Sequence, residues 1–128
     1  MQTKSKILIV DDNKSITKMM TKLLTHEGYD CTFCNESTNA IPLMTGTKFD
    51  FVLLDLAMPG KSGVEIVDEL HQTGQIKNQK IIVLTASSTL QSSFADLKQK
   101  GVLTTLKKPI DIDTLLEIIS QSPYPRSA

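Results

Sequence analysis

Five short runs rich in apolar residues recur along the chain, at residues 6–10, 29–34, 51–54, 81–84 and 102–106. Short, β-branched runs of this kind are typical of strands that are buried on both faces of a parallel sheet. Between and after them, apolar residues recur at helical spacing, around residues 16–24, 39–45, 64–70, 90–97 and 112–119. Five strands that alternate with five helices predict an α/β fold, with one parallel sheet covered by helices on both faces.

Length and charge narrow the class of protein. A chain of 128 residues predicts one domain, which we expect at residues 1–121, followed by a flexible C-terminal tail at residues 122–128. Fourteen Lys and Arg residues balance fourteen Asp and Glu residues, which argues against direct binding of nucleic acid or of a membrane. No apolar run is long enough for a membrane span or a signal peptide, so we expect a cytoplasmic protein.

Cys31 and Cys34 have the C-x-x-C spacing of a redox pair or of half a zinc site. The alternative is a pair of buried, reduced thiols. Both cysteines fall in the second predicted strand, where residues three apart point to opposite faces. We therefore expect two separate reduced thiols.

Polar residues stand at the ends of four of the predicted strands. Asp11 and Asp12 follow the first strand, and Asp55 follows the third. Thr85 follows the fourth strand, and Lys108 follows the fifth. The carboxyl ends of parallel strands meet at one edge of the sheet, where ligands bind in such folds. Polar residues are common after strands because loops face water, and this would explain any one of the five residues. It explains less well that all five lie at the same edge.

Three carboxylates at one edge repel one another unless a cation neutralises them. Oxygen ligands alone suit Mg²⁺, with Mn²⁺ as the alternative, and the absence of thiol and imidazole ligands argues against zinc or copper. The ammonium of Lys108 and the hydroxyl of Thr85 could meet the oxygens of a phosphoryl group beside such a metal. A carboxylate can itself be the nucleophile and form an acyl phosphate, and Asp55, on a central strand, is the candidate.

These residues resemble the response-regulator receiver domain of two-component signalling, over nearly the whole chain from residue 7 to about residue 119. Four motifs carry the resemblance in order: 7–12, 53–60 followed by Ser62 and Gly63, 83–86, and 106–109. The resemblance implies a doubly wound (βα)5, flavodoxin-like fold whose five-stranded parallel sheet has the strand order 2-1-3-4-5. It also implies that a sensor histidine kinase or a histidine phosphotransfer protein donates the phosphoryl group, and that an unknown downstream protein responds.

The resemblance further assigns roles to individual residues. Asp55 would be the phosphoacceptor, and Mg²⁺ would be bound by Asp12, by Asp55 and by the backbone carbonyl of Ala57. Asp11 would act through a metal-bound water. Thr85 and Lys108 would contact the phosphoryl oxygens; Lys108 matches rather than its neighbour because it directly precedes Pro109, whose peptide bond we expect to be cis.

Two departures from the family pattern stand out. Thr105 occupies a switch position where receivers usually carry Tyr or Phe, an aromatic residue that moves inward when the residue at Thr85 turns toward the phosphate. A threonine is too small to fill the same space, so either another residue serves the output face or the switch is muted. No output domain follows the last helix, so we expect a single-domain regulator or a receiver excised from a longer protein, as a monomer or weak homodimer.

Two other functions compete with the phosphoacceptor. One is an aspartate-nucleophile phosphatase, but such enzymes need a second acid two residues after the nucleophile, where this chain has Ala57. The other is an interaction module with the same fold that is not phosphorylated. We expect a phosphoacceptor and switch rather than an enzyme, one that at most catalyses its own phosphotransfer and dephosphorylation.

Overall fold

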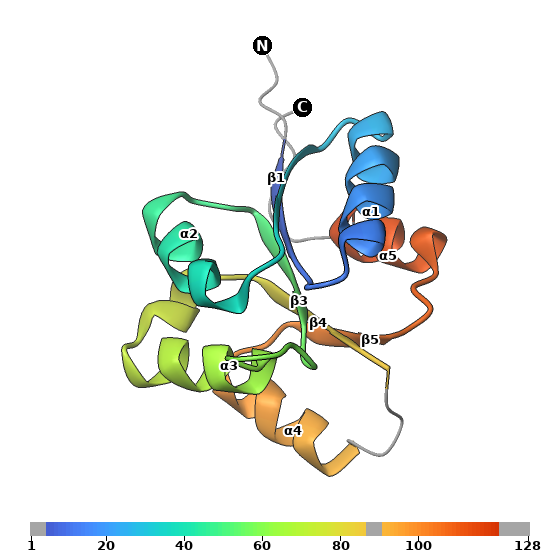
Figure 1. The fold of residues 1–128 in the computed structure, drawn as a ribbon. Coiled ribbons are helices and arrows are strands. Elements are labelled where there is room, and N and C mark those ends of the chain that lie inside the picture. The colour runs from blue at the N-terminus through green and yellow to red at the C-terminus, as the bar shows by residue number, and fades with distance from the viewer. Residues whose placement is uncertain (1–4, 87–90, 121–128) are drawn as a thin grey trace.

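The structure is a computed structural model that describes residues 5–86 and 91–120. Five parallel strands form one sheet in the order β2-β1-β3-β4-β5, which confirms the predicted doubly wound topology (Figure 1). The strands are β1 (Lys6–Val10), β2 (Asp30–Cys34), β3 (Phe51–Asp55), β4 (Ile81–Thr85) and β5 (Thr104–Lys107). The predicted C-terminal tail at residues 122–128 lies outside the described residues.

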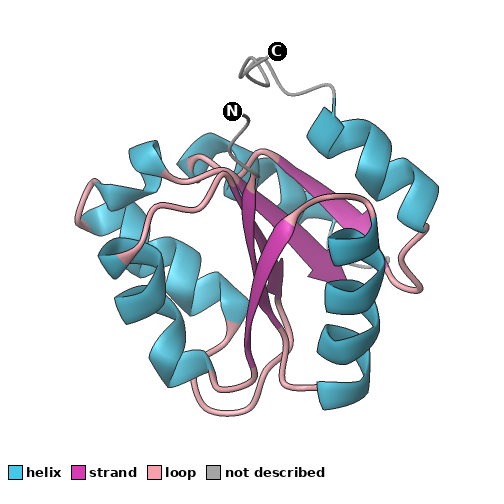
Figure 2. Cartoon of the chain, turned by 90° about the horizontal axis from the view of Figure 1, so that it is seen from above, coloured by secondary structure: helices cyan, strands magenta, loops and turns pink. Residues whose placement is uncertain are grey.

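Helices cover both faces of the sheet (Figures 1 and 2). They are α1 (Lys14–His26), α2 (Ala40–Gly46), α3 (Gly63–Gln72), α4 (Gln91–Lys100) and α5 (Ile112–Ser120), with 3-10 turns η1 (Ser37–Asn39) and η2 (Gln75–Asn78). One layer of the core joins alternate strand residues to α1 and α5, and the other joins the remaining strand residues to α2, α3 and α4. Ile7 faces the first layer and Leu8 the second, which is why the strand runs are apolar without interruption.

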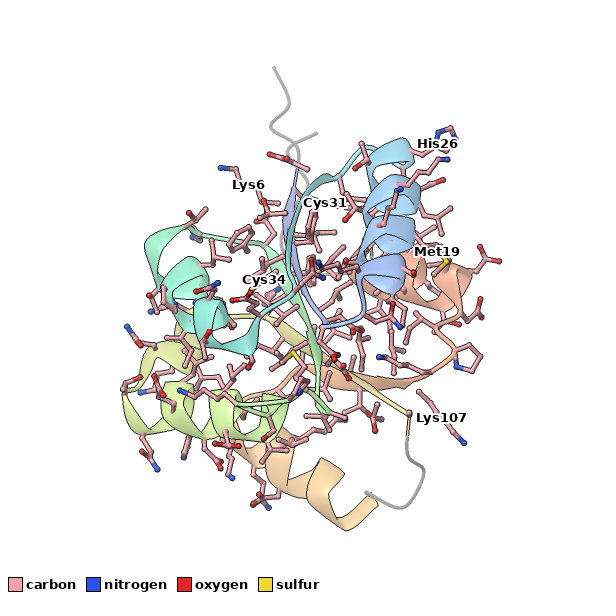
Figure 3. The ribbon with its side chains drawn as sticks, viewed as in Figure 1. Lys6, Met19, His26, Cys31, Cys34 and Lys107 are labelled. Atoms are coloured by element: carbon pink, nitrogen blue, oxygen red, sulfur yellow. The ribbon has the colours of Figure 1, made fainter. Side chains whose placement is uncertain are left out.

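The two cysteines lie on opposite faces of β2, as predicted. Cys34 is buried in the layer beneath α2 and α3, whereas Cys31 packs against the layer beneath α1 (Figure 3). Both thiols are free, and burial is the main cause that raises the pKa of each. The pair is therefore neither a disulfide nor a chelating site.

Two details of the elements differ from the sequence pattern. Met19, which the spacing places on the buried face of α1, is 48% exposed, because the helix contacts the sheet through Met20 and Leu24 and residue 19 lies about 100° away around the axis. β5 begins at Thr104 rather than at residue 102, because the Val102 amide donates to the α4 carbonyl of Leu97.

Among the described residues, no helix has the length and apolar content needed to span a membrane.

Candidate functional site

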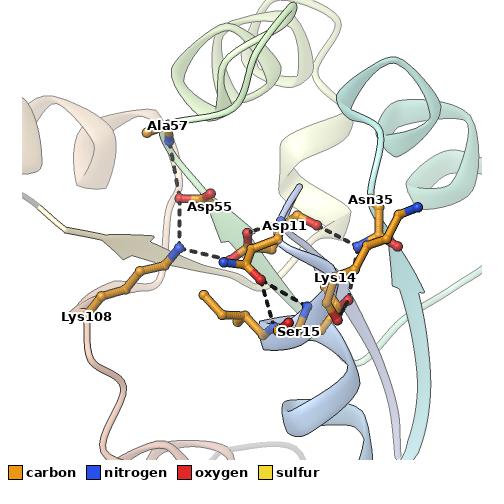
Figure 4. A network of polar contacts seen from close by, with 10 residues as sticks. Asp11, Lys14, Ser15, Asn35, Asp55, Ala57 and Lys108 are labelled. Carbon is orange, nitrogen blue, oxygen red and sulfur yellow. Dashed lines mark hydrogen bonds and ion pairs between the residues drawn. The ribbon is translucent and has the colours of Figure 1, made fainter.

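Three aspartates meet at the carboxyl edge of the sheet, at the ends of two adjacent strands. Figure 4 shows two of them, Asp11 and Asp55. Asp11 and Asp12 follow β1, and Asp55 is the last residue of β3. One carboxylate oxygen of each lies within 4.8 Å of the others. Asp11 is fully buried and Asp55 is only 4% exposed, whereas Asp12 is exposed to solvent. The predicted acidic cluster therefore exists, with its two inner members shielded from water.

Lys108 brings a positive charge to this cluster from the far end of the chain. Its Nζ donates to Asp11 Oδ2 at 2.9 Å and lies 3.5 Å from Asp55 Oδ1. Its backbone amide donates to the carbonyl of Thr85 at 2.7 Å, which ties it to the end of β4. The Lys108–Pro109 peptide bond is cis, as expected. Lys107, by contrast, is exposed and extends away from the sheet edge (Figure 3).

The charges in the cluster are not balanced. Burial, and then the charge of Asp11, raise the pKa of Asp55 to about 6 against the opposing effects of Lys108 and of the Ala57 amide, which donates to Asp55 Oδ1 at 3.2 Å. Burial lowers the pKa of Lys108, but its hydrogen bond to Asp11 and the two carboxylate charges outweigh burial and raise it overall. Among the described residues, the one ammonium paired with the cluster is that of Lys108, which contacts Asp11 and Asp55, so a further cation would be stabilised beside the three carboxylates.

The donor set fits a hard divalent cation. The cluster consists of aspartates, so its ligands are oxygens, which Mg²⁺ prefers and zinc or copper does not. Asp12, the exposed member, gives the cluster an open side where water ligands could remain. The site is therefore chemically suited to Mg²⁺ held by few carboxylates.

Thr85 and Thr105 occupy different places relative to the cluster. Thr85 is the last residue of β4 and lies half-buried at the same edge as the acids. Thr105 lies inside β5, half-buried and paired with Val83 rather than with the strand end. The structure thus brings Thr85 to the site edge and leaves Thr105 further down the sheet.

Several positioning contacts were not predicted from the sequence. The Asn13 amide donates to Asp11 Oδ1 at 2.9 Å, while the Asn13 side chain caps α1 by accepting from the amides of Ser15 and Ile16. Asn35 reaches the carbonyl of Asp11 from the end of β2. An asparagine directly before a helix is a recognisable N-cap signal, so Asn13 could have been found, but no local pattern indicates the contact of Asn35.

Gly63 allows the first turn of α3 to approach the end of β3. A Cβ at this position would lie 2.4 Å from the Asp55 carbonyl oxygen and 2.8 Å from the Cα of Leu56. Ser62 and Glu65 complete a capping box at the start of the same helix. The loop that follows Asp55 is therefore short and closed by a close backbone contact.

A parallel sheet in this order, with an acidic cluster and a lysine at its carboxyl edge, defines the class of receiver domains. The sequence model of the response regulator receiver domain matches residues 7–120, and the chain belongs to this family. Receiver domains are the phosphoacceptor switch domains of two-component response regulators.

Individual relatives agree with this assignment. The chain is 32% identical to sporulation initiation phosphotransferase F of Bacillus subtilis (strain 168) over 116 residues, which cover 91% of each protein. It is 31% identical to response regulator MprA of Mycobacterium sp. (strain KMS) over 111 residues, but spans only 47% of that protein. The structure of response regulator TrrA from Thermotoga maritima, a complex with Mg²⁺–BeF, superposes with a TM-score of 0.78 at 31% identity and covers 91% of this chain and 97% of that one.

Proposed function

We propose that Asp55 accepts a phosphoryl group from a sensor histidine kinase or a histidine phosphotransfer protein, in a reaction that requires Mg²⁺ or Mn²⁺. The observation that supports this most directly is the buried Asp55 carboxylate, which lies within reach of Asp12, Asp11 and Lys108 at one edge of the sheet. In this proposal Asp12, Asp55 and the Ala57 carbonyl hold the metal, and Asp11 acts through a metal-bound water.

The reaction is an in-line displacement at phosphorus. A carboxylate oxygen of Asp55 forms the new P–O bond while the P–N bond of the donor phosphohistidine breaks, and its electron pair returns to the imidazole nitrogen. With a pKa of about 6, Asp55 is mostly ionised at neutral pH and available as the nucleophile. Bound Mg²⁺ would supply charge neutralisation for the phosphoryl oxygens. Lys108 would pair with one of those oxygens, and the Thr85 hydroxyl would donate to another.

The same step would operate a switch. Phosphorylation replaces a carboxylate of charge −1 by a group of charge near −2, so Lys108 would divide its interaction between Asp11 and the phosphoryl group. The movement of Thr85 toward the phosphoryl group would shift β5 and α4, and with them a surface that binds a downstream protein. Thr105 on β5 is too small to fill the space of the usual aromatic residue, so either another residue would serve the output face or the switch would be muted.

We infer an acceptor and switch rather than an enzyme with turnover, acting in the cytoplasm as a monomer or weak homodimer. Ala57 occupies the position where an aspartate-nucleophile phosphatase would need its second acid. That methyl group can neither protonate a leaving group nor activate a water molecule.

The test is phosphorylation by acetyl phosphate, followed by the mass of the intact protein. The wild type should gain one phosphoryl group with Mg²⁺ and none in EDTA. Asp55→Asn should gain none, whereas Asp30→Asn, which removes an exposed aspartate on β2, should label like the wild type. A folded wild type that binds its partner but remains unlabelled would support the interaction module, and steady hydrolysis of a phosphomonoester would support the phosphatase.

A further inference from the structure

Residues 35–37 follow β2 and end on the first residue of η1, and they carry none of the acids or the lysine of the site. Two side chains of this segment nevertheless form hydrogen bonds to the two loops beside the acidic cluster. One of these loops follows β1 and contains Asp11 and Asp12, and the other follows β3 and contains Ala57. The segment therefore contacts both sides of the proposed metal site.

Asn35 holds the first loop. Its half-buried Nδ2 donates to the backbone carbonyl of Asp11 at 2.9 Å and to Thr17 Oγ1 at 3.0 Å (Figure 4). The carbonyl of Asp11 requires a donor, so the amide nitrogen, and not its oxygen, must face it. Asn35 thereby connects the backbone between the two aspartates to the first turn of α1.

Ser37 holds the second loop. Its side chain is buried, with the residue 6% exposed, and Oγ donates to the Pro59 carbonyl at 3.2 Å while it accepts from the Lys61 amide at 3.1 Å. Both of these partners lie between Asp55 and the start of α3. One hydroxyl therefore uses its proton and a lone pair to fix the turn that follows the acceptor.

The segment between these two contacts is itself held in place. Asp11 donates its amide to the carbonyl of Cys34 at 3.1 Å, and the Cys34 thiol donates to the carbonyl of Glu36 at 3.0 Å. Because Asn35 and Ser37 are only two residues apart, the loops they bind cannot separate freely without breaking one of these bonds. Mutual repulsion of the carboxylates would otherwise favour such a separation.

We propose that Asn35 and Ser37 are positioning residues, which hold the loops that follow β1 and β3 at the separation that Mg²⁺ requires. This inference rests on the proposed function, because it assigns a role at the same metal site. Neither side chain is a metal ligand here; each acts through the backbone of a loop that carries one.

Isothermal titration calorimetry of Mg²⁺ with folded variants tests this role without any phosphodonor. Asn35→Ala and Ser37→Ala should each weaken Mg²⁺ binding about tenfold, the lower end of the effect of outer-shell partners on metal affinity. The matched controls Asn39→Ala and Thr38→Ala remove exposed side chains of η1 and should bind like the wild type. Ile7→Val, which trims a buried residue at the opposite end of β1, should lower stability without changing the affinity.

The outcomes separate the two proposals. A wild type that binds no Mg²⁺ overturns the proposed function and this inference together. Wild-type binding with unchanged affinity in both variants overturns the positioning role alone. Hydrogen exchange in the wild type needs no variant: the Lys61 amide should exchange slowly, and exchange at the rate of an unstructured peptide would contradict the role of Ser37 even if Ser37→Ala does not fold.

Discussion

Asp55 is a carboxylate whose ionisation costs free energy in the folded protein. It is almost completely buried, it lies beside Asp11, and the nearest ammonium, that of Lys108, is closer to Asp11 than to Asp55. These conditions raise its pKa to about 6, in spite of the amide hydrogen bond from Ala57. The charge on Asp55 is therefore only partly compensated by the protein, and a bound cation would lower the free-energy cost of its ionisation.

Asp55→Asn should stabilise the metal-free protein at neutral pH. The folded state raises the pKa of Asp55 from 3.8 to about 6, and a group with a raised pKa contributes stability at low pH that is lost as the pH rises through the folded value. The variant has no titrating group at this position and no such loss. The difference in free energy of unfolding between the variant and the wild type should therefore grow between about pH 3.5 and 6.5, by up to about 3 kcal/mol in favour of the variant.

Urea unfolding in EDTA at a series of pH values measures this difference. Asp30→Asn, at an exposed aspartate, serves as the control and should follow the wild type across the range. An Asp55→Asn advantage that stays constant with pH would show that Asp55 titrates as an ordinary carboxyl group.

Lys108→Met should strengthen Mg²⁺ binding while it weakens the metal-free fold. The ammonium interacts with Asp11 and Asp55, so its removal leaves their buried negative charge without this cation. The same removal takes away a repulsion on the incoming cation, worth about 1–2 kcal/mol, or roughly tenfold in affinity. Calorimetric titration with Mg²⁺ checks the sign, with Lys107→Met as the exposed neighbour control. Weaker Mg²⁺ binding by Lys108→Met, with normal binding by Lys107→Met, would contradict this and would mean that Lys108 is needed to hold the aspartates in place for the metal.

At the scale of elements, Gly63 sets how closely α3 can approach β3. Gly63→Ala would place a Cβ 2.4 Å from the Asp55 carbonyl oxygen, so the helix must shift, at a cost of about 1–3 kcal/mol. Gly46→Ala is the matched control, since nothing lies within 4 Å of its Cβ and it ends α2 without a positive φ. Urea unfolding of the two variants should show a loss only at position 63; equal stabilities would contradict the close contact.

Most elements could be predicted from the sequence because their signals are local. All five predicted strands are present, although β5 begins two residues later than predicted. The prediction that Met19 is buried was wrong, because the periodic pattern does not show how much of the helix surface the sheet covers. Asn39 precedes α2 without capping it through its side chain, since η1 already leads the chain into the helix. Such outcomes depend on neighbours in space rather than in sequence.

At the scale of the whole molecule, the order of the strands brings together a charged site that the amino-acid composition does not indicate. The chain has no net charge, yet three aspartates meet at one edge of its sheet. Residues of this edge could be predicted because each directly follows a strand. The hydrogen bond from Lys108 to Asp11 joins residues 97 positions apart in the sequence. The hydrogen bonds of Asn35 and Ser37 to the two loops are not predicted by any short-range sequence pattern. Their geometry required the folded structure.

Mg²⁺ should stabilise the whole fold. A ligand that binds only the folded state adds about 2.7 kcal/mol to the free energy of unfolding at 100 times its Kd. Thermal unfolding of the wild type should therefore shift upward with Mg²⁺ and return in EDTA, whereas Asp12→Asn should need a higher Mg²⁺ concentration for the same shift. An identical shift in both proteins would place the ion elsewhere on the molecule.

The most direct measurement is the location of the phosphoryl group after reaction with acetyl phosphate and Mg²⁺, by fragmentation of the labelled peptides. We expect one group, on the peptide that contains Asp55, assigned to that carboxylate. A label on any other residue, or a folded protein that takes up none, would contradict the central role given to Asp55.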